Sequence, residues 1–183
     1  MTQSRFLTAV DVFDAYPGAA KDIKAKPAAK PPLEYLRGLI ASETPEDALS
    51  FASYYLPKRE AVWWGCQCLR SLLGPSVEGD PGMRAAEDWV KDPGEQQRRA
   101  TLDYALQCDR EAPVTWLALA AGWSGGSMTA SNEHPIPAPP DLAAKSVRAA
   151  VLIGLSQASF KDRQQHIKNC VDAAVRLAEK QRD

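Results

Sequence analysis

The pattern of hydrophobic and polar residues is clearest over residues 57–74, PKREAVWWGCQCLRSLLG. At about 100° per residue, one arc of a helix collects apolar side chains and the opposite arc collects polar ones. The apolar arc consists of Ala61, Val62, Gly65, Cys66, Cys68, Leu69, Leu72 and Leu73, and the polar arc of Arg59, Glu60, Gln67, Arg70 and Ser71. Pro57 suits a first helical turn, and Gly74 followed by Pro75 ends a helix. The pattern therefore predicts a helix whose apolar arc faces the core.

Two adjacent tryptophans depart from this pattern. Trp63 falls among the polar residues, and Trp64 lies near the edge of the polar arc, beside Ser71. One interpretation is that a neighbouring element covers both indoles, or that Arg59 and Arg70 stack over Trp63. The other is a partner-binding surface, because tryptophan and arginine are enriched at the energetic centres of interfaces. The sequence leaves both interpretations open.

Helical patterns and helix-start signals recur along the rest of the chain. The expected N-cap residues are Thr8, Thr44, Asp80, Asp92 and Asp141, three of which precede a proline. Residues 113–123 and 141–158 are apolar on nearly every side, which indicates two buried helices. Residues 160–183 form an amphipathic pattern, and no apolar–polar alternation typical of strands persists. The sequence therefore predicts an all-α fold, an irregular compact bundle of about eight helices with two central buried helices.

Proline-rich segments indicate how the chain is divided. Residues 26–32, KPAAKPP, predict an extended connector. We therefore expect residues 1–32 to form an N-terminal helical arm with its connector, and residues 33–183 to form the helical bundle, within one domain overall. Residues 124–140, SGGSMTASNEHPIPAPP, predict a long polar loop, and a connection of this length inside a domain is often functional.

Length and charge narrow the class of protein. A chain of 183 residues buries enough surface to fold without disulfides or metals. The formal net charge of -1 creates no overall attraction to DNA, RNA or anionic lipid, so we expect neither a nucleic-acid nor a membrane partner. The N-terminal sequence lacks the features of a signal peptide, which favours a cytoplasmic location. Four cysteines are then expected to be reduced thiols used as small core residues: Cys66, Cys68, Cys108 and Cys170.

Residues suited to catalysis or metal binding are few. The two histidines, His134 and His166, lie in different segments, and Cys66 and Cys68 have no second cysteine pair to match them. The sequence therefore predicts neither a metal site nor a cofactor. A histidine could still meet a cysteine or serine across the fold, but no spacing marks such a pair, and no catalytic residue is assigned.

A glycine-rich turn follows the apolar segment 113–123. It lacks the lysine and hydroxyl that end a phosphate-binding loop, and it follows a predicted helix rather than a strand. One interpretation is a helix C-terminal turn through left-handed glycines, and the other is a site where a partner's backbone approaches closely. The candidate partner-binding residues are therefore Arg59, Trp63, Trp64, Arg70, Trp123, Ser124, Gly125, Gly126 and Ser127.

Several segments together carry a family resemblance. They are residues 56–64 (LPKREAVWW), residues 112–128 (APVTWLALAAGWSGGSM) and residues 146–151 (SVRAAV), with residues 44–49 (TPEDAL) upstream. In this order and spacing, and over nearly the whole chain, they resemble an uncharacterised family of bacterial cytosolic proteins. Members of that family are associated with type VI secretion cargo gene neighbourhoods. The resemblance supplies no catalytic residues.

The resemblance implies a non-enzymatic, protein-binding accessory role in type VI secretion. Such an adaptor, chaperone or loading factor would have a secreted effector or a spike component as its partner, and the sequence also permits a homo-oligomer. Two alternatives stay open. One is a small hydrolase or other enzyme with a His/Cys or His/Ser site, and the other is a structural or immunity-type protein. A pocket joining His134 or His166 to a nucleophile would favour the enzyme.

Overall fold

The chain folds almost entirely into helices. The computed structural model describes residues 5–129 and 134–180. Within these residues the elements are α1 (Ala9–Ala15), α2 (Ala19–Asp22), α3 (Pro32–Leu39), α4 (Asp47–Tyr55), α5 (Lys58–Leu73), η1 (Gly74–Val77), α6 (Pro81–Lys91), α7 (Glu95–Leu106), α8 (Pro113–Gly122), α9 (Leu142–Gln157), η2 (Phe160–Asp162) and α10 (Arg163–Lys180). The prediction of an all-α fold is confirmed. The described chain has ten α-helices rather than about eight, and the shortest of them, α2, has only four residues.

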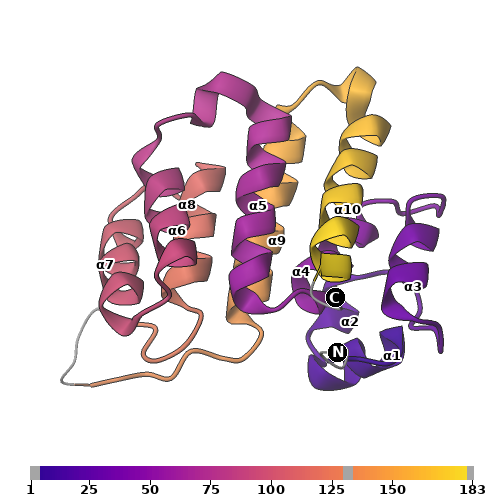
Figure 1. The fold of residues 1–183 in the computed structure, drawn as a ribbon, viewed down its shortest axis with the longest axis horizontal. Helices are drawn as coiled ribbons and strands as arrows, with labels where there is room; N and C mark the ends of the chain where they lie inside the picture. Colours follow the sequence, from indigo (N-terminus) through magenta and orange to yellow (C-terminus); the bar gives the residue numbers. More distant parts are fainter. Residues whose placement is uncertain (1–4, 130–133, 181–183) are drawn as a thin grey trace.

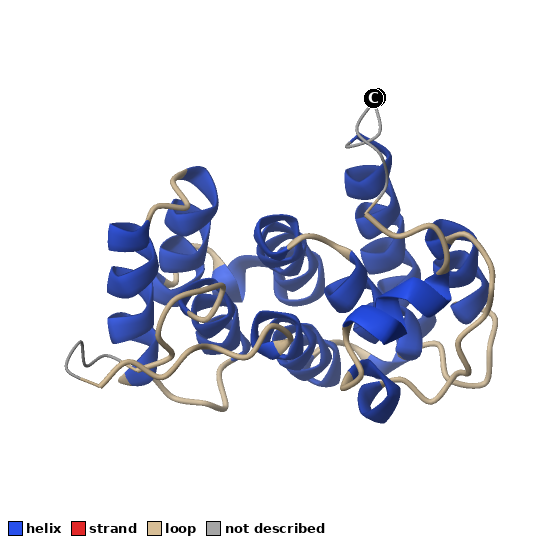
Figure 2. Ribbon diagram, turned by 90° about the horizontal axis from the view of Figure 1, so that it is seen from below, coloured by secondary structure: helices blue, strands red, loops and turns tan. Residues whose placement is uncertain are grey.

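Helix α5 stands at the middle of the molecule. Figure 1 shows it in front of α9, with α6, α7 and α8 on one side and α10 with the N-terminal helices on the other. Figure 2, seen from below, shows the same arrangement as two groups of helices joined through the central pair. Gly65 of α5 allows a close approach here, since a Cβ at this position would meet Leu117 Cδ2 of α8 at 2.4 Å. The absence of a side chain at Gly65 thus lets α8 pack closely against the middle of α5.

Burial differs among the three innermost helices. Every residue of α8 except Trp116 is buried, as the apolar sequence predicts. In α9 the buried residues form one broad face, which includes Val147, Val151 and Leu155. All nine residues of α4 are buried, although its sequence includes an acid and two serines. This helix is therefore covered on every side by the elements around it.

The N-terminal segment covers α4 through aromatic and polar contacts. Seven side chains form a connected aromatic cluster: Phe6, Phe13, Tyr16, Tyr35, Phe51, Tyr54 and Tyr55. The buried Asp47 carboxylate accepts hydrogen bonds from the Ala25 amide and from the Thr44 hydroxyl, both at 2.8 Å. The aromatic residues of the segment thus lie in the same core as the bundle.

The predicted helix starts are partly correct. The Asp80 carboxylate caps α6, accepting from the Gly82 amide at 2.7 Å. Asp92 does not cap α7, because its amide still donates to Asp88 at the end of α6 and Gly94 precedes the first residue of α7. Thr44 does not cap α4, since the helix begins after Glu46. Two of these Asp/Thr-before-proline signals therefore mark the turn between helices rather than the cap itself.

Candidate functional site

Two adjoining cavities follow the outer face of α5, and together they are called the α5 groove here. One cavity, of about 500 Å³, lies between α5 and α10, and the other, of about 430 Å³, lies between α5, α6 and the end of α10. Leu177 and Lys180 line both cavities. Figure 1 shows α5 placed between α6 and α10, which form the two walls. The floor of the groove is the polar arc that the sequence pattern predicts.

The outward residues of α5 recur at helical spacing along this floor. Arg59, Trp63, Gln67 and Arg70 all line one of the two cavities, and they lie three or four residues apart. Such spacing places side chains on one face of a helix. Because α9 and α8 pack on the opposite face, these four side chains remain accessible from solvent. Three of the candidate residues, Arg59, Trp63 and Arg70, therefore lie together.

The two tryptophans have opposite environments. Trp63 is half-buried and lines the second cavity with Val90. Trp64 is fully buried, and its Nε1 donates to the Cys170 carbonyl of α10 at 2.8 Å. The expectation that Trp64 could contact a partner is therefore wrong, because α10 packs over the side of α5 that carries it. Trp63 alone of the pair is available for binding.

Both arginines of the floor are held by α6. Arg59 Nε donates to the Val90 carbonyl at 2.7 Å, and Arg70 forms an ion pair with Glu87. Among the cation–π contacts in the described residues, none involves Trp63. The interpretation that the arginines stack over Trp63 is therefore not what the structure shows, and the half-buried indole lines the second cavity.

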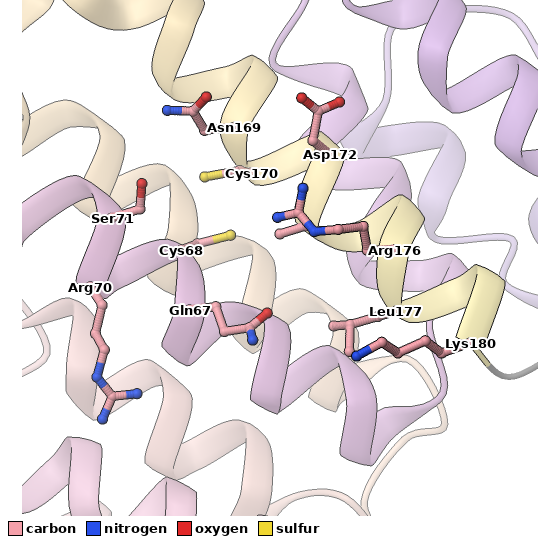
Figure 3. A pocket seen from close by; sticks show the side chains of 11 residues that line it. Gln67, Cys68, Arg70, Ser71, Asn169, Cys170, Asp172, Arg176, Leu177 and Lys180 are labelled. Carbon is pink, nitrogen blue, oxygen red and sulfur yellow. The ribbon is translucent and has the colours of Figure 1, made fainter.

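A pair of thiols lies where α5 meets α10. Figure 3 shows Cys68 and Cys170 on the facing sides of the two helices, and both residues line the first cavity. All four cysteines are unbridged. Burial raises the pKa of the Cys66 thiol to about 12, and burial together with the neighbouring Cys170 raises the pKa of Cys68. A raised pKa disfavours the thiolate, so these two groups are poor nucleophiles.

The walls of the groove contain residues that sequence analysis assigned no role. Val90 and Glu87 come from α6, and Arg176, Leu177 and Lys180 come from α10. Arg176 and Lys180 are exposed, as the amphipathic pattern of α10 predicts. The pattern contains no signal that α10 packs beside α5, so the groove could not be assembled from periodicity alone.

The glycine-rich turn after α8 lies elsewhere and is held by its own contacts. Neither cavity of the α5 groove is lined by residues 123–127. Trp123 is buried, and its Nε1 donates to the Met128 carbonyl at 3.1 Å. The Ser127 hydroxyl accepts from the backbone amides of Thr129 and Ile136. Trp123 and Ser127 therefore act inside the loop, which is contrary to their expected role as partner contacts.

A buried arginine completes this loop. Arg98 of α7 donates to the Gly122 and Ser127 carbonyls and forms a two-point ion pair with Glu95. The hydrogen bonds from Arg98 hold the pKa of the Glu95 carboxyl below its usual value. Gly126 lies over the guanidinium in the left-handed region, with a φ of 58°. The geometry of the loop thus explains why a glycine is found at position 126.

The described residues of this loop do not pair a serine hydroxyl with a histidine. His134 is exposed, and the Ser127 oxygen is already engaged by two amides and by the Thr129 hydroxyl. His166 is half-buried on α10, in the first turn of the helix.

Among the described residues no helix combines the length and the hydrophobicity needed to cross a bilayer. The groove on α5 is therefore the strongest candidate for a functional surface.

Comparison with known proteins gives a family but no activity. Residues 35–178 match the model of a protein family described as a family of unknown function (DUF6931). The matched range includes α4 to α9 and every groove residue named above except Lys180. No curated protein matches the chain. No solved structure matches it.

Proposed function

This chain belongs to DUF6931, a family of unknown function, and from that starting point we propose that it is a non-enzymatic protein-binding accessory factor. The proposed role is that of an adaptor or chaperone-like component of a bacterial type VI secretion system, acting in the cytoplasm. Its partner would be a secreted effector or a spike component, held in the α5 groove. The secretion setting rests on the resemblance of residues 56–64 and 112–128.

The observation that carries the proposal is the partly exposed indole of Trp63 in the floor of a groove. A tryptophan that is partly covered in the free protein can be fully buried by a partner without first being rearranged, and such residues often dominate binding. The floor around it combines apolar surface with arginines held in place by α6. Held side chains lose less entropy on binding than free ones do.

The framework behind the groove suits a binding surface of constant shape. In the proposal α8 and α9 act as the two central helices that support α5 from behind. Three of the four cysteines are buried, and the two with raised pKa are poorly suited to nucleophilic attack. The features described for the groove therefore favour binding over reaction.

Affinity capture from the native bacterium tests this function. Wild-type protein, Trp63→Ala and Phe160→Ala would be used as baits, and captured proteins would be identified by mass spectrometry. Phe160 is 84% exposed and does not line the groove, so it is a matched aromatic control. We expect a secretion effector or spike component with wild type and with Phe160→Ala, and about 10-fold or lower recovery with Trp63→Ala.

The same experiment can overturn the proposal. Circular dichroism and thermal melting would first establish that Trp63→Ala is folded. If a folded Trp63→Ala bait recovers the same proteins in the same amounts, the groove is not the binding site. If no secretion component is captured by wild type, the proposed setting is wrong.

A further inference from the structure

The α5 groove has an excess of positive charge, which the chain as a whole lacks. Five cationic side chains line its two cavities: Arg59, Arg70, Lys91, Arg176 and Lys180. Three carboxylates accompany them: Glu60, Glu87 and Asp172. The groove therefore carries a formal charge of about +2, on a protein whose net charge is -1.

The cations on the rim are the ones left available. Arg70 is neutralised by Glu87, and Arg59 is directed to the Val90 carbonyl. Lys91 shares a 3.4 Å exposed contact with Asp88, which is a weak interaction. Arg176 and Lys180 are exposed and take part in none of the ion pairs between described residues. Lys91 on one wall and Arg176 and Lys180 on the other can therefore meet charges on a partner.

Apolar side chains of the floor and of both walls lie between these rim charges. The hydrophobic residues that line the second cavity are Trp63, Val90 and Leu177, and Ala173 and Leu177 line the first cavity along α10. Figure 3 shows Arg176, Leu177 and Lys180 on the side of α10 that borders the first cavity. The outward residues of α5 run from Arg59 to Ser71, a rise of about 18 Å along the helix. That length matches about three turns of a second helix lying alongside.

We propose that the α5 groove binds an amphipathic α-helix of the partner protein, with acidic residues on both sides of its apolar stripe. The inference rests on the proposed function and specifies the kind of segment that the partner would present. An apolar stripe at i, i+3, i+4 and i+7 would cover Trp63, Val90 and Leu177. Flanking carboxylates would then lie opposite Lys91 on one wall and Arg176 and Lys180 on the other.

A helix fits this surface better than an extended peptide does. Extended peptides are usually bound by adding a strand to a sheet edge, and the described residues contain no sheet that could accept one. A groove walled by two helices instead offers side-chain ridges against which a third helix can pack. The expected complex therefore adds one helix in front of α5.

A peptide selection with defined composition tests the inference. The library would consist of helical peptides with a fixed leucine stripe and with the flanking positions randomised among Glu, Lys, Gln and Ala. Wild-type protein should enrich peptides with a net negative flank. A groove variant with Lys91→Glu, Arg176→Glu and Lys180→Glu should lose that preference and bind the enriched acidic peptide at least 10-fold more weakly.

A matched control separates local charge from total charge. The variant with Lys21→Glu, Lys24→Glu and Lys26→Glu makes the same change in net charge at three exposed lysines that do not line the groove. It should select and bind acidic peptides as wild type does. Trp63→Ala should weaken binding of the acidic peptide about 10-fold or more. The affinity of the wild-type protein for this peptide should fall as the salt concentration is raised.

Every other result overturns the inference. It fails if wild type enriches neutral or basic flanks, if no peptide is enriched in a way that depends on Trp63, or if the two triple variants bind alike. Its failure is distinct from failure of the proposed function. If a secretion component is captured through Trp63 but acidic helical peptides are not preferred, only the proposed function is supported. If acidic helical peptides are preferred but no secretion component is captured, only the inferred binding preference of the groove is supported.

Discussion

The α5 groove and the loop after α8 look alike in sequence and differ in structure. Both place tryptophan beside polar or glycine residues, at Arg59–Trp63 and at Trp123–Ser127. In the groove, the indole of Trp63 stays partly exposed beside a cavity. In the loop, the indole of Trp123 is buried and its nitrogen is satisfied within the loop. A tryptophan among polar residues is therefore ambiguous until the neighbouring elements are placed.

The difference comes from which hydrogen bonds are made internally. The loop backbone pairs with itself, Met128 to Ile136 and Ala138 to Gly126, at 2.8 and 3.0 Å. Arg98 then binds two further carbonyls from inside. In the groove, the rim residues Arg176 and Lys180 point outward from α10 and make no ion pair with a described residue. The loop uses its polar groups for internal hydrogen bonds, whereas Arg176 and Lys180 beside the groove stay exposed to solvent.

The largest expected effect is in the tryptophan pair of α5. Trp64→Ala removes a fully buried ring and leaves the Cys170 carbonyl without its donor, so we expect a loss of about 3–5 kcal/mol in the free energy of unfolding. Trp63→Ala removes a half-buried ring and should cost about 1 kcal/mol. Urea unfolding followed by circular dichroism measures both. Equal losses from the two variants would break the assignment of Trp64 to structure and Trp63 to binding.

The sequence predicts the all-α class and the amphipathic α5, but only Arg59, Trp63 and Arg70 of its candidate residues lie together in the α5 groove. Helical periodicity correctly predicts α5, its apolar arc and its polar arc, because these depend only on residues within one element. It leaves open whether Trp64 is covered, because that depends on where α10 packs, and the Cys170 carbonyl that Trp64 contacts lies 106 residues further along the chain. Asp47 in α4 illustrates the same limit, since its burial follows from partners at Ala25 and Thr44. Periodicity describes a helix, whereas a groove requires three helices to be placed together.

A second prediction concerns the arginine inside the loop. Arg98→Ala leaves the Gly122 and Ser127 carbonyls without their buried donor, so we expect a loss of about 2–3 kcal/mol in unfolding free energy. Arg84→Ala, at an exposed position on α6, should change stability by less than about 0.5 kcal/mol. Binding of the acidic helical peptide by folded Arg98→Ala should equal that of wild type. Impaired peptide binding would show that the loop contributes to the groove after all.

The smallest effect distinguishes two adjacent glycines of the same loop. Gly126 has a φ of 58°, and a Cβ there would meet Arg98 Nη2 at 2.8 Å, so Gly126→Ala should cost about 1–2 kcal/mol. Gly125 has no positive φ and no atom within 4 Å of an added Cβ, so Gly125→Ala should be close to neutral in stability. Thermal unfolding of the two variants gives this comparison directly. A different result would be that both alanine variants are as stable as wild type and that Gly125→Ala weakens partner capture. The loop would then be a contact surface, because Gly125 would serve the close approach of a partner rather than the loop's own geometry. The contrast with the α5 groove would be lost.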